Sequence, residues 1–301
     1  MGSLFGGGLA SSGHEVVLYD VYKDHVDAIN RDGLAIEDAA TGAVKVVRPK
    51  ASADPEAVRD SDVMIIFVKS TNTEEAAADF KAYAKPSTIA LTLQNGLGNE
   101  AILRKHFGPA RTAAGVTSQG ATFLGPGKIR HAGKGPTHMA MADGDQSKLA
   151  KLAEALAAAG FEIHVDKDVA GMIWSKLLIN VGINAMTALL NVTNGRLLEF
   201  ADIKDIMAEM VEEAMAVAKA RGISLNYADP LAVVYDVAAK TGANFSSMLQ
   251  DFQKNRRSEI DFMNGAIVRE AKELGIPVPV NETVTRLVRT LDRLHAGKQG
   301  A

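Results

Sequence analysis

The sequence contains no cysteine, so disulfides and thiolate chemistry are excluded. A reducing cytosol is the natural setting for such a chain, and no basic-then-apolar signal segment opens the printed sequence. We therefore expect a cytoplasmic protein. The seven histidines show no metal-ligand spacing, and we expect no metal site.

The sequence also lacks a strong charge of one sign and long apolar runs. A formal net charge of −3 gives no general attraction to nucleic acids or anionic membranes. The longest weakly charged stretch, residues 177–192, contains Asn180, Asn184 and Asn191, and looks too short and too polar to span a bilayer. We therefore expect neither a nucleic acid nor a membrane as partner. What is present, 47% hydrophobic and 23% charged residues in a chain of 301, is ordinary for a globular enzyme of two domains.

The first half of the chain alternates strand and helix patterns. We predict strands at 15–19, 63–68, 88–93 and 161–165, helices at 23–31, 73–83 and 146–159, a hairpin insertion at 34–47, and several strands within 112–142. The continuous apolar run VMIIFV at 63–68 is typical of a strand buried on both faces of a parallel sheet. This alternation predicts a doubly wound α/β domain over residues 1–167.

From residue 168 onward the pattern becomes helical. We predict helices at 168–192, 198–221, 229–240, 247–274 (broken near 255) and 281–296. The sequence therefore predicts an all-α domain over residues 168–301. No low-complexity linker separates the two domains, which favours a packed junction with a cleft where ligands usually bind.

The opening stretch, MGSLFGGGLASSGHEVVLYD, reads as the continuation of a dinucleotide-binding βαβ unit after its phosphate loop. Such a unit begins with a strand and G-x-G-x-x-G, and Gly2 stands where the third glycine would be. The first strand and two glycines are therefore missing from the printed sequence. A start codon placed too late is the simpler explanation, and a real truncation is the other. If this shorter chain is the protein, we expect weak cofactor binding, and a dissociation constant equal to that of an upstream-extended version would contradict this.

Three polar residues stand out in the helix predicted at 168–192. Lys176, Asn180 and Asn184 are spaced i, i+4 and i+8, so they lie along one face of a helix whose other residues are mostly apolar. A solvated stripe is usually made of Glu, Lys and Arg, because Asn is a poor helix former. The pattern therefore favours a polar ligand over solvent as the partner of this face.

Two further candidates follow buried strands. Lys69 ends the run VMIIFV, and Asn95 follows the strand at 88–93. In open parallel sheets, ligands bind beyond the carboxyl ends of the strands, so both residues lie at the appropriate edge. A solvated lysine and a turn asparagine would produce the same pattern.

The segment at 243–265 contains candidates that are weak in isolation. Ser247 followed by Gln250 fits a capping box, so this serine would equally well begin a helix. Glu259 is predicted in a helix beside two arginines and Asp261, where it would ordinarily be a surface carboxylate.

The sequence as a whole resembles the ketopantoate reductase (2-dehydropantoate 2-reductase) family, over nearly its entire length. The resemblance rests on GHEVVLYD, the strand-end lysine of VMIIFVKS, LQNGLG, WSKLLINVGINAMTALLNVTNG and NFSSMLQDFQKNRRSEIDFMNG. It implies a Rossmann-type sheet, here without its first strand, followed by a helical domain like that of 6-phosphogluconate dehydrogenase. It also implies reduction of ketopantoate to pantoate with NADPH or NADH, for pantothenate and coenzyme A synthesis. A homodimer is expected by family analogy.

The resemblance implies a role for each candidate. Lys176 matches the catalytic lysine, a general acid that protonates the ketone oxygen as hydride arrives. Glu259 matches a carboxylate that orients the cofactor ribose and this lysine. The remaining matches are substrate contacts at Asn180, Asn184, Asn244 and Ser247, a residue reaching both substrate and cofactor at Asn95, and cofactor contacts at Lys69 and Gly2.

Asp20 departs from the family pattern. It ends the second strand of the expected βαβ unit, where an acidic residue accepts hydrogen bonds from the ribose of NAD and repels a 2′-phosphate. Many ketopantoate reductases have an arginine nearby and prefer NADPH, whereas the nearest cation here is Lys23. We therefore predict that NADH is used at least as well as NADPH.

Two alternatives to ketopantoate reduction remain open, the first because of Asp20 and the second because the phosphate loop is degenerate. One is an NAD-dependent dehydrogenase of another 2-hydroxy acid branched at C3, which would need the same kinds of pocket residue. The other is a non-catalytic dinucleotide-binding protein. The joint presence of Lys176, Glu259 and the substrate-contact residues argues against the second, because a binding module needs no general acid.

Overall fold

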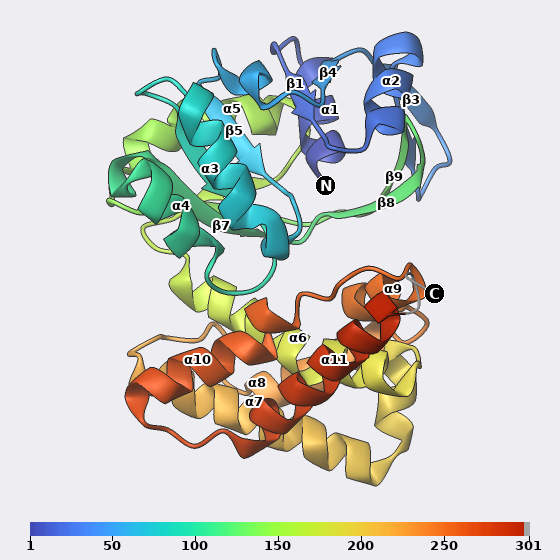
Figure 1. The fold of residues 1–301 in the computed structure, drawn as a ribbon, viewed down its shortest axis with the longest axis vertical. Coiled ribbons are helices and arrows are strands. Elements are labelled where there is room, and N and C mark those ends of the chain that lie inside the picture. Colours follow the sequence, from blue (N-terminus) through green and yellow to red (C-terminus); the bar gives the residue numbers. More distant parts are fainter. Residues whose placement is uncertain (298–301) are drawn as a thin grey trace. The chain divides into compact units, whose positions relative to one another are not determined.

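The computed structural model of the chain describes residues 1–297, which form two compact units. Unit 1 comprises Met1–Gln94 and Asn99–Val169, and unit 2 comprises Asn95–Gly98 and the chain from Ala170 onward (Figure 1). The short segment Asn95–Gly98 thus belongs with the second unit, although it lies inside the range 1–167 expected for the first domain.

Unit 1 contains a five-stranded sheet in the order β11-β10-β7-β6-β5. Its strands are β5 (Val63–Ile66), β6 (Ile89–Thr92), β7 (Thr112–Thr117), β10 (Thr137–Met141) and β11 (Ile163–Val165). β5, β6 and β7 run parallel, whereas β10 is antiparallel to β7 and parallel to β11. The prediction of an α/β sheet is confirmed, with an antiparallel pair that the alternation of the sequence did not reveal.

Helices cover both faces of this sheet, because its strands bury alternate residues on opposite sides. Met64 and Ile66 of β5 pack with α3 (Thr73–Tyr83) and α4 (Asn99–Phe107). Leu91 of β6 packs with the opposite core, which contains residues of α1 (Gly2–Ser11) and α5 (Ala150–Ala158). Two-sided burial explains the continuous apolar run in this part of the sequence.

Two further sheets complete unit 1. β1 (Val17–Tyr19) pairs in parallel with β4 (Lys50–Ser52). The predicted hairpin forms from β2 (Leu34–Asp38) and β3 (Val44–Val47), but it is not a separate insertion. β2 also pairs in parallel with β9 (Lys128–Gly133), which pairs with β8 (Gly120–Gly125), so these elements form one four-stranded sheet with α2 (Lys23–Asp32) preceding β2.

Parallel strand pairs occur in all three sheets of unit 1. Among the described residues, β1 pairs with β4 alone. β5 is the edge strand of the five-stranded sheet and pairs with β6 alone. α1 is the first described element of unit 1 and precedes β1. The ring of Phe5 in α1 lies 4.6 Å from that of Phe161 and 5.1 Å from that of Phe67.

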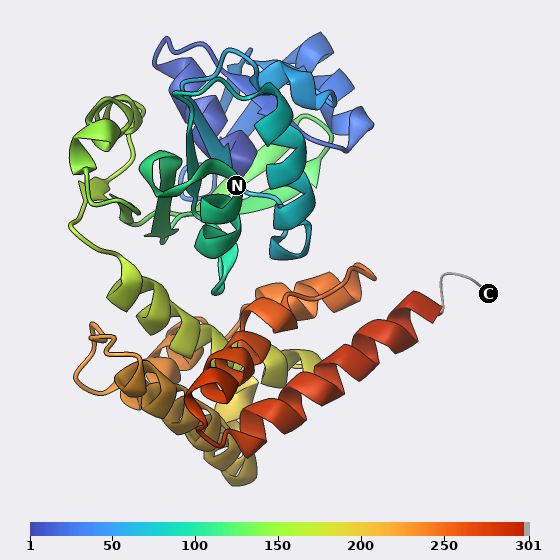
Figure 2. The same cartoon turned by 60° about the vertical axis from the view of Figure 1, so that its left-hand side comes forward.

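Unit 2 is helical, as the sequence predicts. It contains α6 (Ala170–Leu190), α7 (Ala201–Ala220), α8 (Pro230–Lys240), α9 (Ser247–Gln253), α10 (Asn264–Leu274) and α11 (Pro279–Gly297). Figure 2 shows α11, coloured red, as one long unbroken helix. The predicted break near residue 255 is confirmed: α9 ends at Gln253, and Asn255 adopts a left-handed conformation with φ of 51°.

The central helix of unit 2 is α6, and buried residues cover most of its surface. Trp174, Leu177 and Val181 are among the residues that pack into the unit's core. Of the described helices, α6 alone is long and apolar enough to cross a membrane by length and composition, and about two thirds of the apolar window is buried. The judgement that this region is too short and polar was therefore wrong on those two criteria, because the helix begins at Ala170 and includes the apolar turn before Lys176.

Candidate active site

The polar face of α6 combines one cation with two amides. Lys176 is partly exposed, and burial of its side chain lowers the pKa of the ammonium to about 8. Asn184 is buried, and the Nδ2 atom of Asn180 is buried without a hydrogen-bond partner among the described residues. A buried amide N–H that lacks a partner costs about 1–3 kcal/mol, so the face is incomplete without a ligand or water that accepts from it.

The side chains of Asn184 and Ser247 lie together, as the resemblance implies. Asn184 Nδ2 is 3.4 Å from Ser247 Oγ and 3.4 Å from Met263 Sδ. The contact between Asn184 Nδ2 and Ser247 Oγ is long for a hydrogen bond to oxygen, so it is weak and leaves the Ser247 hydroxyl available to a better partner.

The capping explanation of Ser247 was wrong. The N-cap of α9 is Ser246, whose hydroxyl accepts from the backbone N–H of Leu249 at 3.1 Å and from Thr187 Oγ1 at 2.6 Å. Ser247 is the first residue of the helix, and its side chain faces Asn184 instead. Two adjacent serines made the sequence ambiguous, because either one fits the capping pattern.

Asn244 lies on the exposed loop before α9, and the structure adds a neighbour that the sequence analysis missed. The backbone N–H of Asn194 donates to the carbonyl of Asn244 at 3.0 Å. The side-chain Nδ2 of Asn194 donates to Thr241 Oγ1 at 2.8 Å. Asn194 Oδ1 is buried without a hydrogen-bond partner among the described residues. The sequence contains a turn signal at this position, Asn-Gly at residues 194–195, within the segment WSKLLINVGINAMTALLNVTNG that carries the resemblance.

Glu259 is not on a helix, contrary to the prediction. It is buried, with 7% of its surface exposed, and it immediately precedes the short 3₁₀ turn Ile260–Phe262. The left-handed Asn255 ends the preceding helix and redirects the chain, so the surface position expected from helical spacing does not arise.

The turn containing Asn95 packs on this same segment within unit 2. The backbone N–H of Leu97 donates to the carbonyl of Phe262 at 2.8 Å. Gly96 has φ of 85°, and a Cβ atom on it would lie 2.4 Å from that carbonyl oxygen. The LQNGLG motif therefore requires glycine at this position both for backbone conformation and for space. Asn95 and Glu259 are thus held on interacting segments.

Unit 1 carries the other candidates at the carboxyl ends of its parallel strands. Asp20 follows β1 and accepts a hydrogen bond from the backbone N–H of Tyr22 at 2.9 Å. Lys69 follows β5 and precedes the turn Ser70–Asn72. Both positions are at the sheet edge where ligands bind in open α/β folds.

A buried polar network that the sequence analysis missed connects the ends of β5 and β6. Gln94 Nε2 donates to the carbonyl of Val68 at 2.6 Å and to Thr73 Oγ1 at 2.8 Å. Thr73 Oγ1 donates to Asn99 Oδ1, and Asn99 Nδ2 donates to Ser70 Oγ. These contacts fix the backbone on either side of Lys69 and immediately before Asn95. Short-range patterns do not reveal such a network, because its members are far apart in sequence.

α1 begins at Gly2, the residue for which the resemblance implies a cofactor contact. No side chain caps the helix, and the carbonyl of Met1 accepts from the backbone N–H groups of Leu4 at 2.9 Å and Phe5 at 3.1 Å. A Cβ atom at Gly2 would lie 3.9 Å from Phe67, an ordinary contact, whereas one at Gly6 would lie 2.4 Å from Leu18 Cδ2. A Cβ atom at Gly7 would likewise lie 2.6 Å from Ile36 Cδ1 of β2, so Gly6 and Gly7 both allow close packing of α1 on neighbouring strands. No group of three or more metal-ligating side chains occurs among residues 1–297.

Two sequence profiles of known protein families match this chain. The sequence profile described as "Ketopantoate reductase PanE/ApbA" matches residues 1–144, and that of "Ketopantoate reductase PanE/ApbA C terminal" matches residues 168–292. The chain belongs to the ketopantoate reductase PanE/ApbA family. The 2-dehydropantoate 2-reductase of Halobacterium salinarum is 37% identical over 294 residues, which cover 97% of this chain and 96% of the relative. That of Pyrococcus abyssi is 32% identical and covers 99% of this chain and 97% of the relative.

Two solved structures have the same fold as this chain. A PanE/ApbA family ketopantoate reductase from Ralstonia eutropha JMP134 matches with a TM-score of 0.90 and 36% identity, over 98% of this chain and 96% of that one. D-mandelate dehydrogenase in a ternary structure with NADH and anilino(oxo)acetate matches with a TM-score of 0.88 and 28% identity, over 98% and 96% of the two chains. These relatives support a nicotinamide dinucleotide as the cofactor of this chain.

Proposed function

We propose that this protein reduces ketopantoate, a 2-keto acid, to pantoate with hydride from NADH or NADPH. The observation that carries the proposal is the face of α6, where an ammonium and a buried, unpartnered amide N–H lie on an otherwise apolar helix. Such a surface is costly without a polar ligand, and a 2-keto acid with a hydroxyl group has acceptors for each of these donors.

Lys176 is the general acid in this mechanism. Hydride addition to the carbonyl carbon develops negative charge on the ketone oxygen, and the ammonium stabilises that charge and transfers a proton to it. Burial assists this step, because the lowered pKa of Lys176 makes its ammonium a better proton donor while leaving it mostly charged at neutral pH.

The amides and hydroxyl around Lys176 hold the substrate. Asn180 offers its unpartnered N–H, and Asn184 and Ser247 offer groups whose mutual contact is weak. Asn244 adds an amide from the loop before α9, and Asn194, at the start of the 3₁₀ helix Asn194–Glu199, adds a buried Oδ1 acceptor that has no partner among the described residues. Neutral donors of this kind bind carboxylate and hydroxyl oxygens without competing with Lys176 for the reacting ketone.

The cofactor supplies the hydride, and residues of each unit are assigned to it. In unit 1 these are the N-terminus of α1 at Gly2, Asp20 at the end of β1 and Lys69 at the end of β5. In unit 2 Asn95 and Glu259 lie on the two segments that the Leu97–Phe262 hydrogen bond joins.

The titration of Lys176 predicts the pH dependence of the reaction. The protonated form is required, so kcat/KM for reduction should be constant below about pH 8 and fall about tenfold for each further pH unit above it. Oxidation of the hydroxy acid requires the neutral amine and should show the opposite slope. Initial rates in both directions across this pH range check the assignment, and a reduction rate that stays flat well above the pKa would contradict it.

Asp20 should set the cofactor preference. We expect NADH to be used at least as well as NADPH, and Asp20→Ala to shift the ratio of kcat/KM values toward NADPH by about tenfold, because a carboxylate near a 2′-phosphate costs roughly 1 kcal/mol or more. Asp24→Ala, at an exposed acidic residue on the first turn of α2, is the matched control and should leave the ratio unchanged. A strong NADPH preference in the unmodified protein would refute the prediction and point to Lys23.

A second candidate is an NAD-dependent dehydrogenase of another 2-hydroxy acid branched at C3. Asp20 favours it, and so does the likeness to D-mandelate dehydrogenase solved with NADH. Rates with ketopantoate, benzoylformate and 2-ketoisovalerate, each with both cofactors, separate the two candidates. The ketopantoate proposal requires the highest kcat/KM with ketopantoate, and preference for either of the other acids favours the second candidate.

A further inference from the structure

The segment that carries Glu259 is held by the last described helix of unit 2. The backbone N–H of Ser258 donates to Asp292 Oδ1 at 2.9 Å, and its hydroxyl donates to Asp292 Oδ2 at 2.7 Å. Ser258 is buried, with 1% of its surface exposed, so Asp292 is the partner that satisfies both groups in the absence of solvent.

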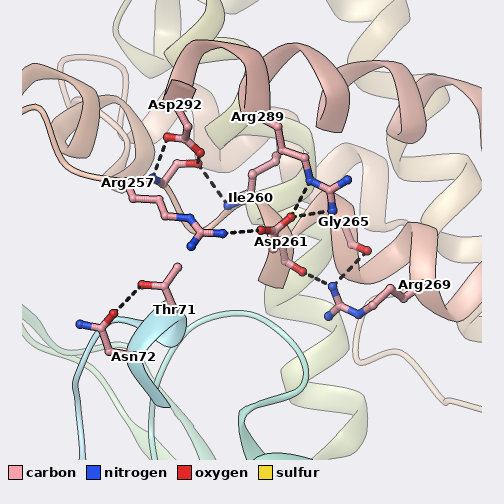
Figure 3. Close-up of polar contacts among 10 residues, drawn as sticks. Thr71, Asn72, Arg257, Ile260, Asp261, Gly265, Arg269, Arg289 and Asp292 are labelled. Atoms are coloured by element: carbon pink, nitrogen blue, oxygen red, sulfur yellow. Dashed lines mark hydrogen bonds and ion pairs between the residues drawn. The ribbon is translucent and has the colours of Figure 1, made fainter. Parts of the chain in front are cut away.

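Three arginines contact Asp261, which lies two residues after Glu259 in the sequence (Figure 3). Arg289 donates to Asp261 Oδ1 at 2.7 Å, and Arg257 donates to Oδ2 at 3.2 Å. Arg269 donates to the backbone carbonyl of Asp261 at 2.5 Å and reaches that of Gly265 at 3.4 Å. Charge-assisted contacts of this kind are stronger and more directional than neutral ones.

One contact on each side of Glu259 comes from the same turn of α11. Arg289 and Asp292 are three residues apart, so they lie on the same face of that helix. One contacts Ser258 and the other contacts Asp261, and Glu259 lies between these two points in sequence. The buried carboxylate is therefore carried on a short non-helical segment whose two sides are fixed to a rigid element.

We propose that Asp292, together with Arg289, is a positioning residue for Glu259, an inference that rests on the proposed function. Neither side chain needs to touch substrate or cofactor. They set the backbone geometry from Ser258 to Asp261 and thereby the direction of the Glu259 carboxylate. Because a displacement of about 1 Å in a positioned group can cost on the order of 10²-fold in rate, contacts outside the site control its activity.

The test is a set of variants measured well below their unfolding temperatures. Asp292→Ala should lower kcat/KM by about 10-fold to 100-fold. Asp292→Asn, whose amide can still accept from the Ser258 N–H and donate to its hydroxyl, should recover to within about threefold of the unmodified protein. Arg293→Ala, at an exposed position on the same turn, is the matched control and should have no effect. Arg289→Ala should act in the same direction as Asp292→Ala.

A double-mutant cycle separates positioning from plain stabilisation. If Asp292 acts through Glu259, then adding Asp292→Ala to Glu259→Gln should change kcat/KM by less than about twofold, because the group being positioned is already disabled. Independent effects of the two substitutions, or an Asp292→Ala protein with unchanged kcat/KM, would overturn the inference.

Hydrogen exchange of the amides of residues 258–262 provides a readout that does not need turnover. Asp292→Ala should accelerate this exchange by about tenfold, and Arg293→Ala should not. If the unmodified protein reduces none of the 2-keto acids, the proposed function fails, and unchanged exchange in Asp292→Ala would separately overturn the positioning role. Accelerated exchange there would support it.

Discussion

Replacing Lys176 by methionine should lower kcat by about 10²–10⁴-fold, the range that a positioned general acid contributes. Methionine retains the apolar stem that packs along α6 but removes the proton and the charge, so folding should be little affected. Cofactor affinity should stay within about twofold of the unmodified protein, because an interaction made with the developing alkoxide contributes only in the transition state.

The control for this prediction is Lys272→Met, at an exposed lysine on α10. It should leave both kcat and cofactor affinity unchanged. Steady-state rates and titration of cofactor fluorescence are the measurements. A Lys176→Met protein that retains normal turnover would show that another group protonates the ketone, and the proposed mechanism would be wrong.

Gly96→Ala should be the most damaging single methyl addition in the LQNGLG turn. The backbone at this position has φ of 85°, and the new Cβ would lie 2.4 Å from the carbonyl oxygen of Phe262. A left-handed L-residue costs about 1–2 kcal/mol and an overpacked contact about 1–3 kcal/mol, so the free energy of unfolding should fall by roughly 2–5 kcal/mol. The displacement should also reduce kcat/KM by about 10²-fold, since Asn95 is the adjacent residue.

Gly98→Ala is the matched control. Its φ of 110° is also positive, but the nearest atom to an added Cβ is Arg269 Nη2 at 3.7 Å, an ordinary contact. It should show the conformational cost without the clash. Denaturant unfolding and kcat/KM of both variants check the difference, and equal effects would mean that the contact with Phe262 has no particular role.

Most secondary structure could be predicted from the sequence because its signals are local. The run VMIIFV indicates a buried strand, and the period of the apolar residues in the second half indicates helices. The antiparallel position of β10 and the pairing of β2 with β9 could not be predicted, because they join segments far apart in the chain. Alternation alone does not encode strand order.

The candidate site shows the same division. The one-face arrangement of Lys176, Asn180 and Asn184 follows from helical geometry, and the structure places all three on α6. Ser246 rather than Ser247 as the cap, and the burial of Glu259, depend on backbone conformations that the sequence pattern left ambiguous. Asp292 carried no signal, because its partner Ser258 is distant in sequence and an aspartate on an amphipathic helix ordinarily faces solvent.

The central claim is that NADH or NADPH reduces ketopantoate while Lys176, on the polar face of α6, protonates the ketone oxygen. Loss of cofactor absorbance on adding ketopantoate, with NADH and NADPH in parallel, tests it most directly when pantoate is quantified as the product. We expect the amount of cofactor oxidised to equal the amount of pantoate formed. The rate with NADH should be at least as high as the rate with NADPH. Absence of pantoate with both cofactors, while another 2-keto acid branched at C3 is reduced, would contradict it.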